Sequence, residues 1–286
     1  MWMNMWKGLA SNVSFVLFRL LLSTSPFPQN SLPAWQESDN MIKINSFFQK
    51  QTEKKYRHEL KYLCGATDIP ILKAGLKGIA RLDSHVGEKG YYHIRSLYFD
   101  DYNNTCYKMN EAGVDDRMKY RIRIYNHSEK QITLEKKIKL HGMTRKLSTP
   151  LTREQCQLLI QGKNLSLKQE EFEHYSKLLQ EFVVWIAVKN GKPKVIVAYD
   201  RIPYVYKQGN VRITIDENIQ SSVDFAHFFH RDMTSAPILP KGRVLLEVKY
   251  DELLPSFLKE RLEIGRLQQT TFSKYYLCRK FASMGL

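Results

Sequence analysis

Charged and apolar side chains alternate with a period of two along much of the chain. In the stretch RMKYRIRIYN, which begins at Arg117, every second residue up to Arg123 is Lys or Arg, and the residues between them are apolar or aromatic. A period of two places neighbouring side chains on opposite faces of a β-strand. The stretch therefore predicts a strand with one cationic face and one apolar face.

Similar alternation predicts several further strands. Residues 126–130 form a turn signal after the strand Asp116–Tyr125, so this strand and the next one form a predicted hairpin. A second turn at His141-Gly142 leads to Arg145. The further predicted strands are residues 55–64, 91–101, 131–140, 194–206, 211–219 and 243–251. Capping residues and helical periodicity predict helices at about residues 67–79, 152–161, 170–181, 255–263 and 271–282.

These elements predict an α+β fold built on an antiparallel sheet. If the sheet closes into a barrel with its charged faces inside, the interior becomes a polar tunnel, and helices must cover the apolar outside. No repeat and no long low-complexity segment interrupts residues 41–286, which we therefore expect to form one domain.

The first forty residues are predicted to be an extension followed by a linker. The apolar run of residues 12–22 is interrupted by Arg19 and falls short of the roughly 20 residues that a membrane-spanning helix needs. Residues 23–40 are rich in Pro, Ser and Asn. The sequence favours an upstream extension with Met41 as the natural start, and leaves a weak membrane anchor as the alternative.

The charge balance indicates a polyanionic partner. The chain has 286 residues, 44 Lys+Arg against 29 Asp+Glu, and a formal net charge of +15. From Arg117 to Lys146 ten Lys or Arg accompany only two Glu. Like charges about 7 Å apart on one strand face repel by about 2 kcal/mol at an effective dielectric near 20, and a concave face screens this less than an open one. A bound triphosphate would relieve the repulsion; for any single strand, a solvated outer face is the alternative.

Three glutamates lie on the predicted cationic faces. Glu59, Glu135 and Glu247 each precede a lysine by two residues. They either temper the repulsion as charge partners or hold a hard divalent cation that bridges phosphate oxygens. The sequence alone leaves both interpretations open.

Other kinds of site are disfavoured by the sequence. The chain has four cysteines, Cys64, Cys106, Cys156 and Cys278. They form no C-x-x-C pair and have no histidines at metal-ligand spacing. This favours buried thiols in a reduced, cytoplasmic protein. The chain has no P-loop motif and no evident Ser-His-Asp or Cys-His arrangement. Its basic residues follow strand alternation rather than a stacking platform, so no nucleic-acid partner is expected.

A series of short motifs resembles a known family. The motifs, in chain order, are RHELKY from Arg57, RSLYFD from Arg95, KYRIRIY from Lys119, LEKKIK from Leu134, YDRIPY from Tyr199, RITID from Arg212, LEVKY from Leu246 and SKY from Ser273. The series resembles the VTC domain, the polyphosphate polymerase module of the vacuolar transporter chaperone family, over roughly residues 54–280. This family belongs to the triphosphate tunnel metalloenzymes, so the resemblance implies an antiparallel β-barrel tunnel with helices packed outside and a C-terminal helix.

The resemblance also implies an activity and a set of site residues. The expected enzyme is a phosphotransferase that moves the γ-phosphate of ATP to a growing polyphosphate chain, with Mn²⁺ or Mg²⁺ as cofactor. Phosphoryl transfer needs positioning and charge neutralisation rather than a covalent nucleophile. By match of motif, the catalytic residues that hold phosphates would be Lys61, Arg95, Arg121, Arg123, Lys137, Arg201, Arg212, Lys249 and Lys274. Further substrate-binding residues would be Arg57, Lys119, Lys139, Arg145 and Ser273, and the metal ligand would be Glu247, with Glu59 and Glu135 as weaker candidates.

One departure from related tunnel enzymes bears on the reaction. The first strand carries a single glutamate, Glu59, before Lys61, where many tunnel triphosphatases have two alternating glutamates. This argues mildly against a dedicated triphosphatase. A tunnel hydrolase acting on tripolyphosphate or nucleoside triphosphates and a non-catalytic module binding polyphosphate or inositol phosphates are the alternatives. Membrane association, a membrane-protein partner and the oligomeric state stay open.

Overall fold

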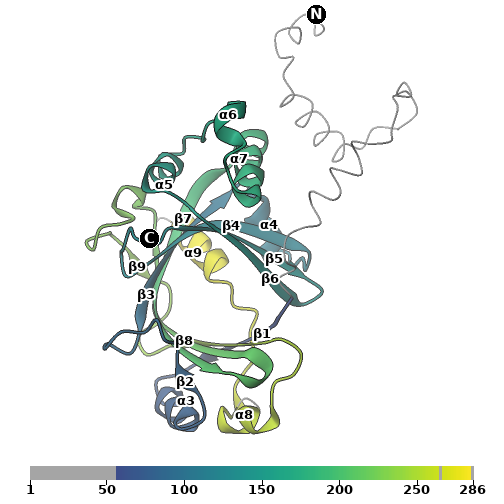
Figure 1. The fold of residues 1–286 in the computed structure, drawn as a ribbon. Coiled ribbons are helices and arrows are strands. Elements are labelled where there is room, and N and C mark those ends of the chain that lie inside the picture. Colours follow the sequence, from purple (N-terminus) through teal and green to yellow (C-terminus); the bar gives the residue numbers. More distant parts are fainter. Residues whose placement is uncertain (1–55, 264–265, 285–286) are drawn as a thin grey trace, which may run out of the picture. The chain divides into compact units, whose positions relative to one another are not determined.

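The computed structural model describes residues 56–263 and 266–284, so the predicted extension and linker of residues 1–40 lie outside the described residues. One compact unit, residues 54–167 with 172–286, carries the sheet shown in Figure 1 and the candidate site. No helix of the described residues is long and apolar enough to cross a membrane.

The strands of the described residues form one antiparallel sheet of ten strands. They pair in the order β1-β10-β8-β7-β3-β4-β5-β6, with β2 beside β7 and β9 beside β8. The strands are β1 (His58–Cys64), β2 (Arg81–Leu82), β3 (Tyr92–Asp100), β4 (Arg117–Tyr125), β5 (Thr133–Leu140), β6 (Met143–Pro150), β7 (Lys192–Tyr206), β8 (Val211–Ser222), β9 (Ala236–Pro237) and β10 (Val244–Tyr250). The predicted strands and the β4–β5 hairpin are confirmed, whereas β2, β6 and β9 were not predicted.

The sheet curls until its two end strands meet. Arg57, just before β1, and Thr144 of β6 exchange two backbone hydrogen bonds of 2.9 Å. Farther along β1, the backbone N–H of Thr270 donates to the carbonyl of Lys61, so the segment before the last helix also lies along this edge. The predicted antiparallel barrel is thereby confirmed (Figure 1), with a short seam between β1 and β6.

The helices agree with the predictions only in part. They are α3 (Asp68–Leu76), α4 (Thr105–Glu111), α5 (Arg153–Ile160), α6 (Gln169–Phe172), α7 (Lys177–Lys189), α8 (Ser256–Arg261) and α9 (Lys274–Ser283), and short 3₁₀ turns lie at Gln208–Asn210 and Phe225–His227. The predicted capping box at Thr152 is present on α5. The predicted helix at 170–181 is wrong, because Ser176 starts a new helix by accepting a hydrogen bond from the backbone of Leu179 at 3.3 Å, and that helix, α7, runs to Lys189. Helix α4 was not predicted.

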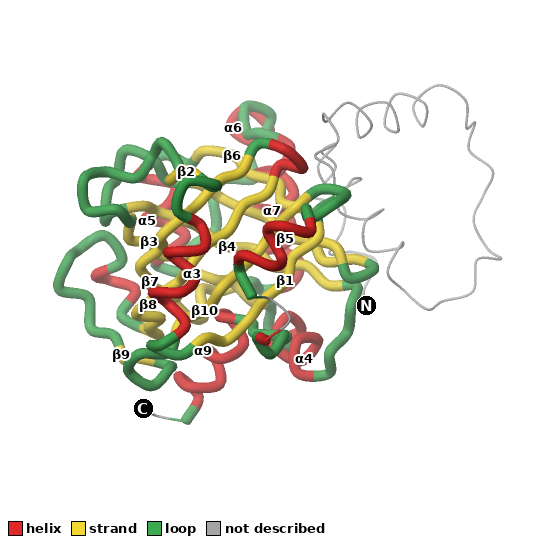
Figure 2. The backbone as a smooth tube through the Cα atoms, turned by 90° about the horizontal axis from the view of Figure 1, so that it is seen from below, coloured by secondary structure: helices red, strands yellow, loops and turns green. Residues whose placement is uncertain are grey.

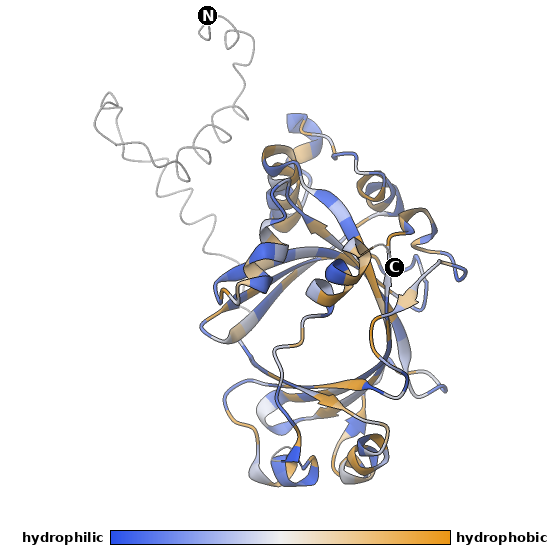
Figure 3. Ribbon diagram, turned by 180° about the vertical axis from the view of Figure 1, so that it is seen from behind, coloured by the Kyte–Doolittle hydropathy of each residue, from blue (hydrophilic) through white to orange (hydrophobic). Residues whose placement is uncertain are grey.

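Helices cover the apolar outer face of the sheet. On β4, Tyr120, Ile122 and Ile124 are buried against side chains of α5 and α7. A second apolar cluster joins α3 and α8 to the outer faces of β8 and β10. Figure 2 shows α3 lying across the strands from outside, and Figure 3 shows hydrophilic and hydrophobic residues interleaved along the strands. The predicted inversion, with charged residues inside and apolar residues under external helices, is confirmed for these strands.

Part of the barrel interior is apolar, which the sequence did not predict. Helix α9 lies inside the curled sheet (Figure 1), and its Tyr275 and Cys278 pack with Tyr98, Val195 and Val197. All these side chains are buried. The charged interior is therefore confined to the part of the barrel that α9 leaves open. The cysteines Cys64, Cys106, Cys156 and Cys278 are all free and buried.

Candidate phosphate-binding cavity

A cavity of about 580 Å³ lies inside the barrel and is lined largely by charged side chains. Its walls come from β1, β3, β4, β5, β6, β7 and β10, together with α4, the start of α9 and the segment before it. Of the residues predicted from the sequence, the cavity brings together Lys61, Arg121, Arg123, Lys137, Arg201, Lys249, Lys274, Lys119, Lys139, Ser273, Glu59 and Glu247. Their roles toward phosphate or metal stay predictions.

The cationic face of β4 faces this cavity. Arg117, Lys119, Arg121 and Arg123 all line it, and the residues between them face the outer apolar core. The alternation follows from the pleat of the strand. The alternation from Arg117 to Arg123 therefore supplies one whole wall of the site.

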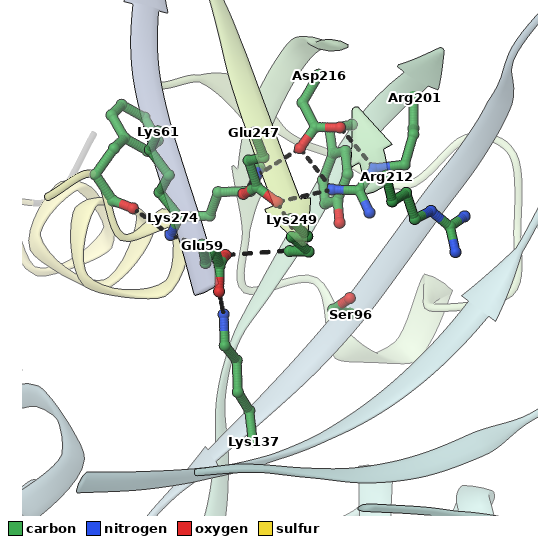
Figure 4. A network of polar contacts seen from close by, with 12 residues as sticks. Glu59, Lys61, Ser96, Lys137, Arg201, Arg212, Asp216, Glu247, Lys249 and Lys274 are labelled. Carbon is green, nitrogen blue, oxygen red and sulfur yellow. Dashed lines mark hydrogen bonds and ion pairs between the residues drawn. The ribbon is translucent and has the colours of Figure 1, made fainter. Parts of the chain in front are cut away.

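Glu59 is surrounded by lysines from three strands. Its carboxylate lies 2.6 Å from Lys137 Nζ on β5, 3.5 Å from Lys61 Nζ and 3.8 Å from Lys249 Nζ on β10 (Figure 4). Burial alone would raise the pKa of Glu59, but these lysines, Lys137 foremost, hold it well below its usual range. Glu59 is therefore ionised at neutral pH and partly offsets the positive charge of the cavity.

A second acidic centre joins β7, β8, β10 and α9. Glu247 lies 2.7 Å from Lys274 Nζ, 3.0 Å from Lys249 Nζ and 3.5 Å from Arg201 Nη2. Asp216, which is fully buried, lies 2.6 Å from both Arg201 Nε and Lys274 Nζ (Figure 4). Burial opposes ionisation of both carboxyls, yet their cationic partners lower the pKa of each. Sequence reasoning missed Asp216, although its position on the same face of β8 as Arg212 was a signal.

Glu135 points to the inward face of β5 but does not line the cavity. Its carboxylate is 2.6 Å from Arg121 Nη2, 2.7 Å from Lys146 Nζ and 3.8 Å from Arg123 Nη1. These cations hold the pKa of Glu135 well below its usual range, against the opposing effect of burial. Of the two interpretations of this glutamate, the contacts support the charge partner: Glu135 braces the arginines of β4. Lys146 was not among the predicted site residues.

Lys119 differs from the other cavity lysines in having neutral partners. Its Nζ donates to Asn110 Oδ1 at 2.8 Å and to Ser273 Oγ at 3.1 Å, and it lies 5.0 Å from the centre of the Tyr275 ring. Burial, followed by the nearby charge of Lys137, lowers the pKa of Lys119 well below its usual range. Burial also lowers the pKa of Lys137, to about 7, although Glu59 opposes this shift.

Two predicted residues lie on the opposite face of the sheet. On β3, Ser96 and Tyr98 point inward toward Arg123 and Arg121, so Arg95 points outward. Arg95 Nη1 donates to the carbonyl oxygen of Phe228 at 2.9 Å and to neighbouring carbonyls, which fixes the segment after β8. This placement corrects the expectation that Arg95 holds phosphates in the tunnel.

Arg145 also lies on the outer face of the sheet. The two-residue turn at His141-Gly142 pairs Lys137 with Lys146 and Ile138 with Arg145. Paired residues share a face, so Lys146 points inward and Arg145 points outward, where its guanidinium lies 5.9 Å from the centre of the Tyr56 ring. The expected tunnel position of Arg145 is therefore taken by Lys146.

Two further predicted residues lie on the inward face but outside the cavity lining. Arg57 Nε is 2.8 Å from Asp251 Oδ1. Arg212 Nη2 donates to Asp83 Oδ2 and to the Tyr92 hydroxyl, each at 2.9 Å. Both arginines are thus engaged by protein groups, and the structure does not bring them together with the cavity cations.

The donors in the cavity suit a hard divalent cation completed by substrate oxygens. Glu59 Oε1 is buried without a hydrogen-bond donor, and Glu247 is close enough to oppose the lowering of the pKa of Glu59. Within the described part of the chain, no group of three or more His, Cys, Asp or Glu side chains could hold a metal ion. Mg²⁺ is commonly held by one or two carboxylates with phosphates and water. Glu59 and Glu247 fit Mn²⁺ or Mg²⁺ in that manner.

Comparisons with known proteins bear on the family and the fold. The family model described as the VTC domain matches residues 56–283. No curated protein matches the chain significantly. A solved Bacillus halodurans protein, provisionally named an adenylate cyclase, is 16% identical with a TM-score of 0.47, and the match covers 77% of this chain and 94% of that one. The S. pombe RNA triphosphatase Pct1 is 12% identical with a TM-score of 0.27, covering 91% and 94%. At this similarity the activities of these two proteins carry no argument about this chain.

Proposed function

The chain belongs to the VTC domain family, and from this premise we propose that it is a polyphosphate polymerase, which transfers the γ-phosphate of ATP to a growing polyphosphate chain in the cavity. The family match across residues 56–283 includes every strand of the described sheet. ATP and inorganic polyphosphate are the proposed substrates. The observation that carries the proposal is the convergence of cations from five strands and α9 on one enclosed space.

The cavity side chains suit phosphoryl transfer without a covalent intermediate. Arg121 and Arg123 present guanidinium groups, which make bidentate contacts to phosphate oxygens. Lys137, Lys249 and Lys274 supply point charges from other walls. Such a set can align donor and acceptor phosphates and neutralise the negative charge on the transferred group, which are the main demands of this reaction.

The carboxylates keep the cations charged and in place before substrate binds. Asp216 and Glu247 raise the pKa of Lys274 above its usual range, against the opposing effect of burial. Lys274 is therefore a fixed positive charge at the start of α9. Bound between Glu59, Glu247 and phosphate oxygens, Mn²⁺ or Mg²⁺ would supply further neutralisation of charge on the reacting phosphates.

A gel assay with matched variants tests the proposal. The purified protein is incubated with ATP and Mn²⁺, and the products are separated on a gel stained for polyphosphate. We expect long chains from the wild type and from Lys136→Met, because Lys136 lies on the outer face beside Glu181 and the Tyr120 ring. Lys137→Met, one residue along the strand, should abolish them.

Each other outcome has a defined meaning. Release of free phosphate without chains would replace the polymerase with a tunnel hydrolase. Tight polyphosphate binding without turnover would indicate a binding module. Equal activity of the Lys136→Met and Lys137→Met variants would contradict the placement of the reaction in the cavity.

A further inference from the structure

Lys119 is a half-buried cation with no carboxylate partner among residues 56–263 and 266–284. The other lysines that line the cavity lie within ion-pair distance of an acid: Lys61 and Lys137 of Glu59, Lys139 of Asp115, and Lys249 and Lys274 of Glu247. Lys119 instead donates to the side-chain oxygens of Asn110 and Ser273. An ammonium buried in this way lacks the compensation that its neighbours have.

The groups around Lys119 come from several elements and are mostly positive or neutral. Arg117 lies on its own strand, Lys137 on β5 and Lys61 on β1, and all three disfavour the charged form of Lys119. The thiol of Cys106 on α4 slightly favours it. The Tyr275 ring and the Ser273 hydroxyl face it from α9 and its cap, and Glu111 of α4, which also lines the cavity, accepts a hydrogen bond from Tyr276.

The partners of Lys119 are suited to an anion that enters the cavity. Ser273 caps α9, a helix of ten residues, by accepting from the backbone N–H of Tyr276 at 3.3 Å. The Asn110 side chain accepts from the ammonium through Oδ1 and donates from Nδ2 to the carbonyl oxygen of Cys106 at 2.8 Å, which fixes it beside Lys119; both Asn110 and Ser273 line the cavity with Lys119. A phosphate there would meet an ammonium and a hydroxyl, with no carboxylate in contact with that ammonium.

We propose that Lys119, Asn110 and Ser273 form a phosphate subsite that takes up a proton from solvent when a phosphate group binds. This inference rests on the proposed function, because it assumes that the cavity binds linked phosphates. In the empty cavity, burial and the surrounding cations favour the neutral amine of Lys119. A bound phosphate reverses that balance, so Nζ gains a proton from the buffer, while no bond to phosphorus forms or breaks.

Most other cavity cations do not share this behaviour, because they stay charged beside an anionic partner. Lys137 is the exception: burial lowers its pKa to about 7 although Glu59 opposes the shift, so it too gains charge when phosphate binds. Phosphate binding at Arg121 or Lys274 changes the partner of a group that is charged before and after binding. The Lys119 subsite would therefore make the affinity for phosphate chains depend on pH. Where free Lys119 is neutral, the affinity should fall by about tenfold for each unit of rising pH.

Calorimetric titration with sodium tripolyphosphate, without metal, tests this inference. Titrations at one mildly alkaline pH in buffers of different ionisation enthalpy count the protons taken up on binding. The wild type should take up about one proton more than Lys119→Arg, because arginine stays protonated in both states. Lys119→Gln should also lose this uptake, and with it affinity. Lys136→Gln, which removes a charge from the outer face of β5, should keep the proton uptake.

The outcomes separate this inference from the proposed function. Tight binding with equal proton uptake by the wild type and Lys119→Arg would overturn the subsite and leave the polymerase proposal standing. No binding of tripolyphosphate by the wild type would overturn both. NMR of ¹³C-lysine-labelled wild-type protein gives a second readout that needs no stable variant. Two lysines, Lys119 and Lys137, should titrate well below the others in the free protein and stay charged when tripolyphosphate is bound. Fewer than two such lysines would also overturn the subsite.

Discussion

Lys137 Nζ and Glu59 Oε2 lie 2.6 Å apart, although their strands lie near opposite ends of the sheet order. The ion pair forms because the sheet curls until β1 meets β6, so that only β6 separates β5 from β1 around the barrel. One salt bridge thus joins the cation-rich wall of β4 and β5 to the mixed wall of β1 and β10. It also ties a predicted phosphate ligand to a predicted metal ligand.

Replacing Lys137, the cationic member of this pair, should weaken phosphate binding. Lys137→Met removes a charge-assisted contact worth about 1.5–3 kcal/mol, so the Kd for tripolyphosphate should rise by roughly 10- to 150-fold. Isothermal titration calorimetry measures the change. Lys136→Met is the matched control on the outer face, and its Kd should stay within about twofold of the wild type. Equal weakening in both variants would contradict the inward orientation of Lys137.

Two buried arginines on adjacent strands should behave differently. Arg123 and Arg95 are 5% and 3% exposed, but Arg123 lines the cavity and Arg95 binds carbonyls outside it. Arg123→Met should therefore raise the Kd for tripolyphosphate by roughly 10- to 100-fold, whereas Arg95→Met should leave it nearly unchanged. Both should lower the melting temperature, because each leaves buried acceptors without a donor. Loss of phosphate affinity in Arg95→Met with its fold intact would restore that residue to the site.

Asp216 should stabilise the fold in a pH-dependent way. Its pKa is lowered in the folded state because Arg201 and Lys274 outweigh the effect of burial. Its ionised form therefore contributes stability above its unfolded pKa of about 3.9, and the contribution is lost as pH falls through the folded value. Asp216→Asn should lower the free energy of unfolding at pH 7 by about 3–5 kcal/mol, because it breaks a buried ion network.

Urea unfolding at pH 7 and at pH 3 measures this effect. The difference between the wild type and Asp216→Asn should be smaller at pH 3 than at pH 7. The exposed Asp232 provides the control, and Asp232→Asn should leave the unfolding curve unchanged at both pH values. A constant difference for Asp216→Asn across this range would show that its carboxylate is not stabilised by the network.

Glu247 should affect metal and phosphate in opposite directions. Glu247→Gln removes the negative charge of a proposed metal ligand. Mn²⁺-dependent turnover should therefore fall by roughly 10- to 150-fold, as for the loss of one charge-assisted contact. It also frees Lys249 and Lys274 from an anionic partner. Tripolyphosphate binding without metal should therefore be retained or become tighter. If turnover at saturating Mn²⁺ matches the wild type, Glu247 is a charge partner and not a metal ligand.

The strand pattern predicted β4 and its wall of the cavity in full. Strict alternation from Arg117 to Arg123 decides which side chains share a face, and burial of the apolar side then forces the charged side inward. Similar logic predicted Glu59 and Lys61 on β1 and Glu247 and Lys249 on β10. Local alternation suffices here because each strand separates its charged and apolar residues cleanly.

The orientation of a side chain was predicted wrongly where it depends on how one strand pairs with another. The two-residue turn at His141-Gly142 pairs Lys137 with Lys146 and so directs Arg145 outward, whereas alternation within one strand does not set the register between two strands. Arg95 is flanked by mostly apolar residues on both faces of β3, so its strand carried little signal of direction. Asp216 was missed because a single acid on a mixed strand does not stand out, whereas its two cationic partners come from β7 and α9.

The interior position of α9 was also hidden in the sequence. Residues 195–199, VIVAY, are apolar without alternation, which is typical of a strand buried on both faces. The inward half of this run packs against α9. The sequence therefore contained a signal that part of the barrel is filled, but not which helix fills it.

The most direct test of the central claim is the crystal structure of the protein with tripolyphosphate bound. We expect the phosphate chain inside the barrel, with oxygens about 2.7–2.9 Å from nitrogens of Arg121, Arg123 and Lys249. Phosphate density confined to the outer surface beside Arg95 or Arg145, with the cavity left empty, would contradict a barrel built to hold linked phosphates.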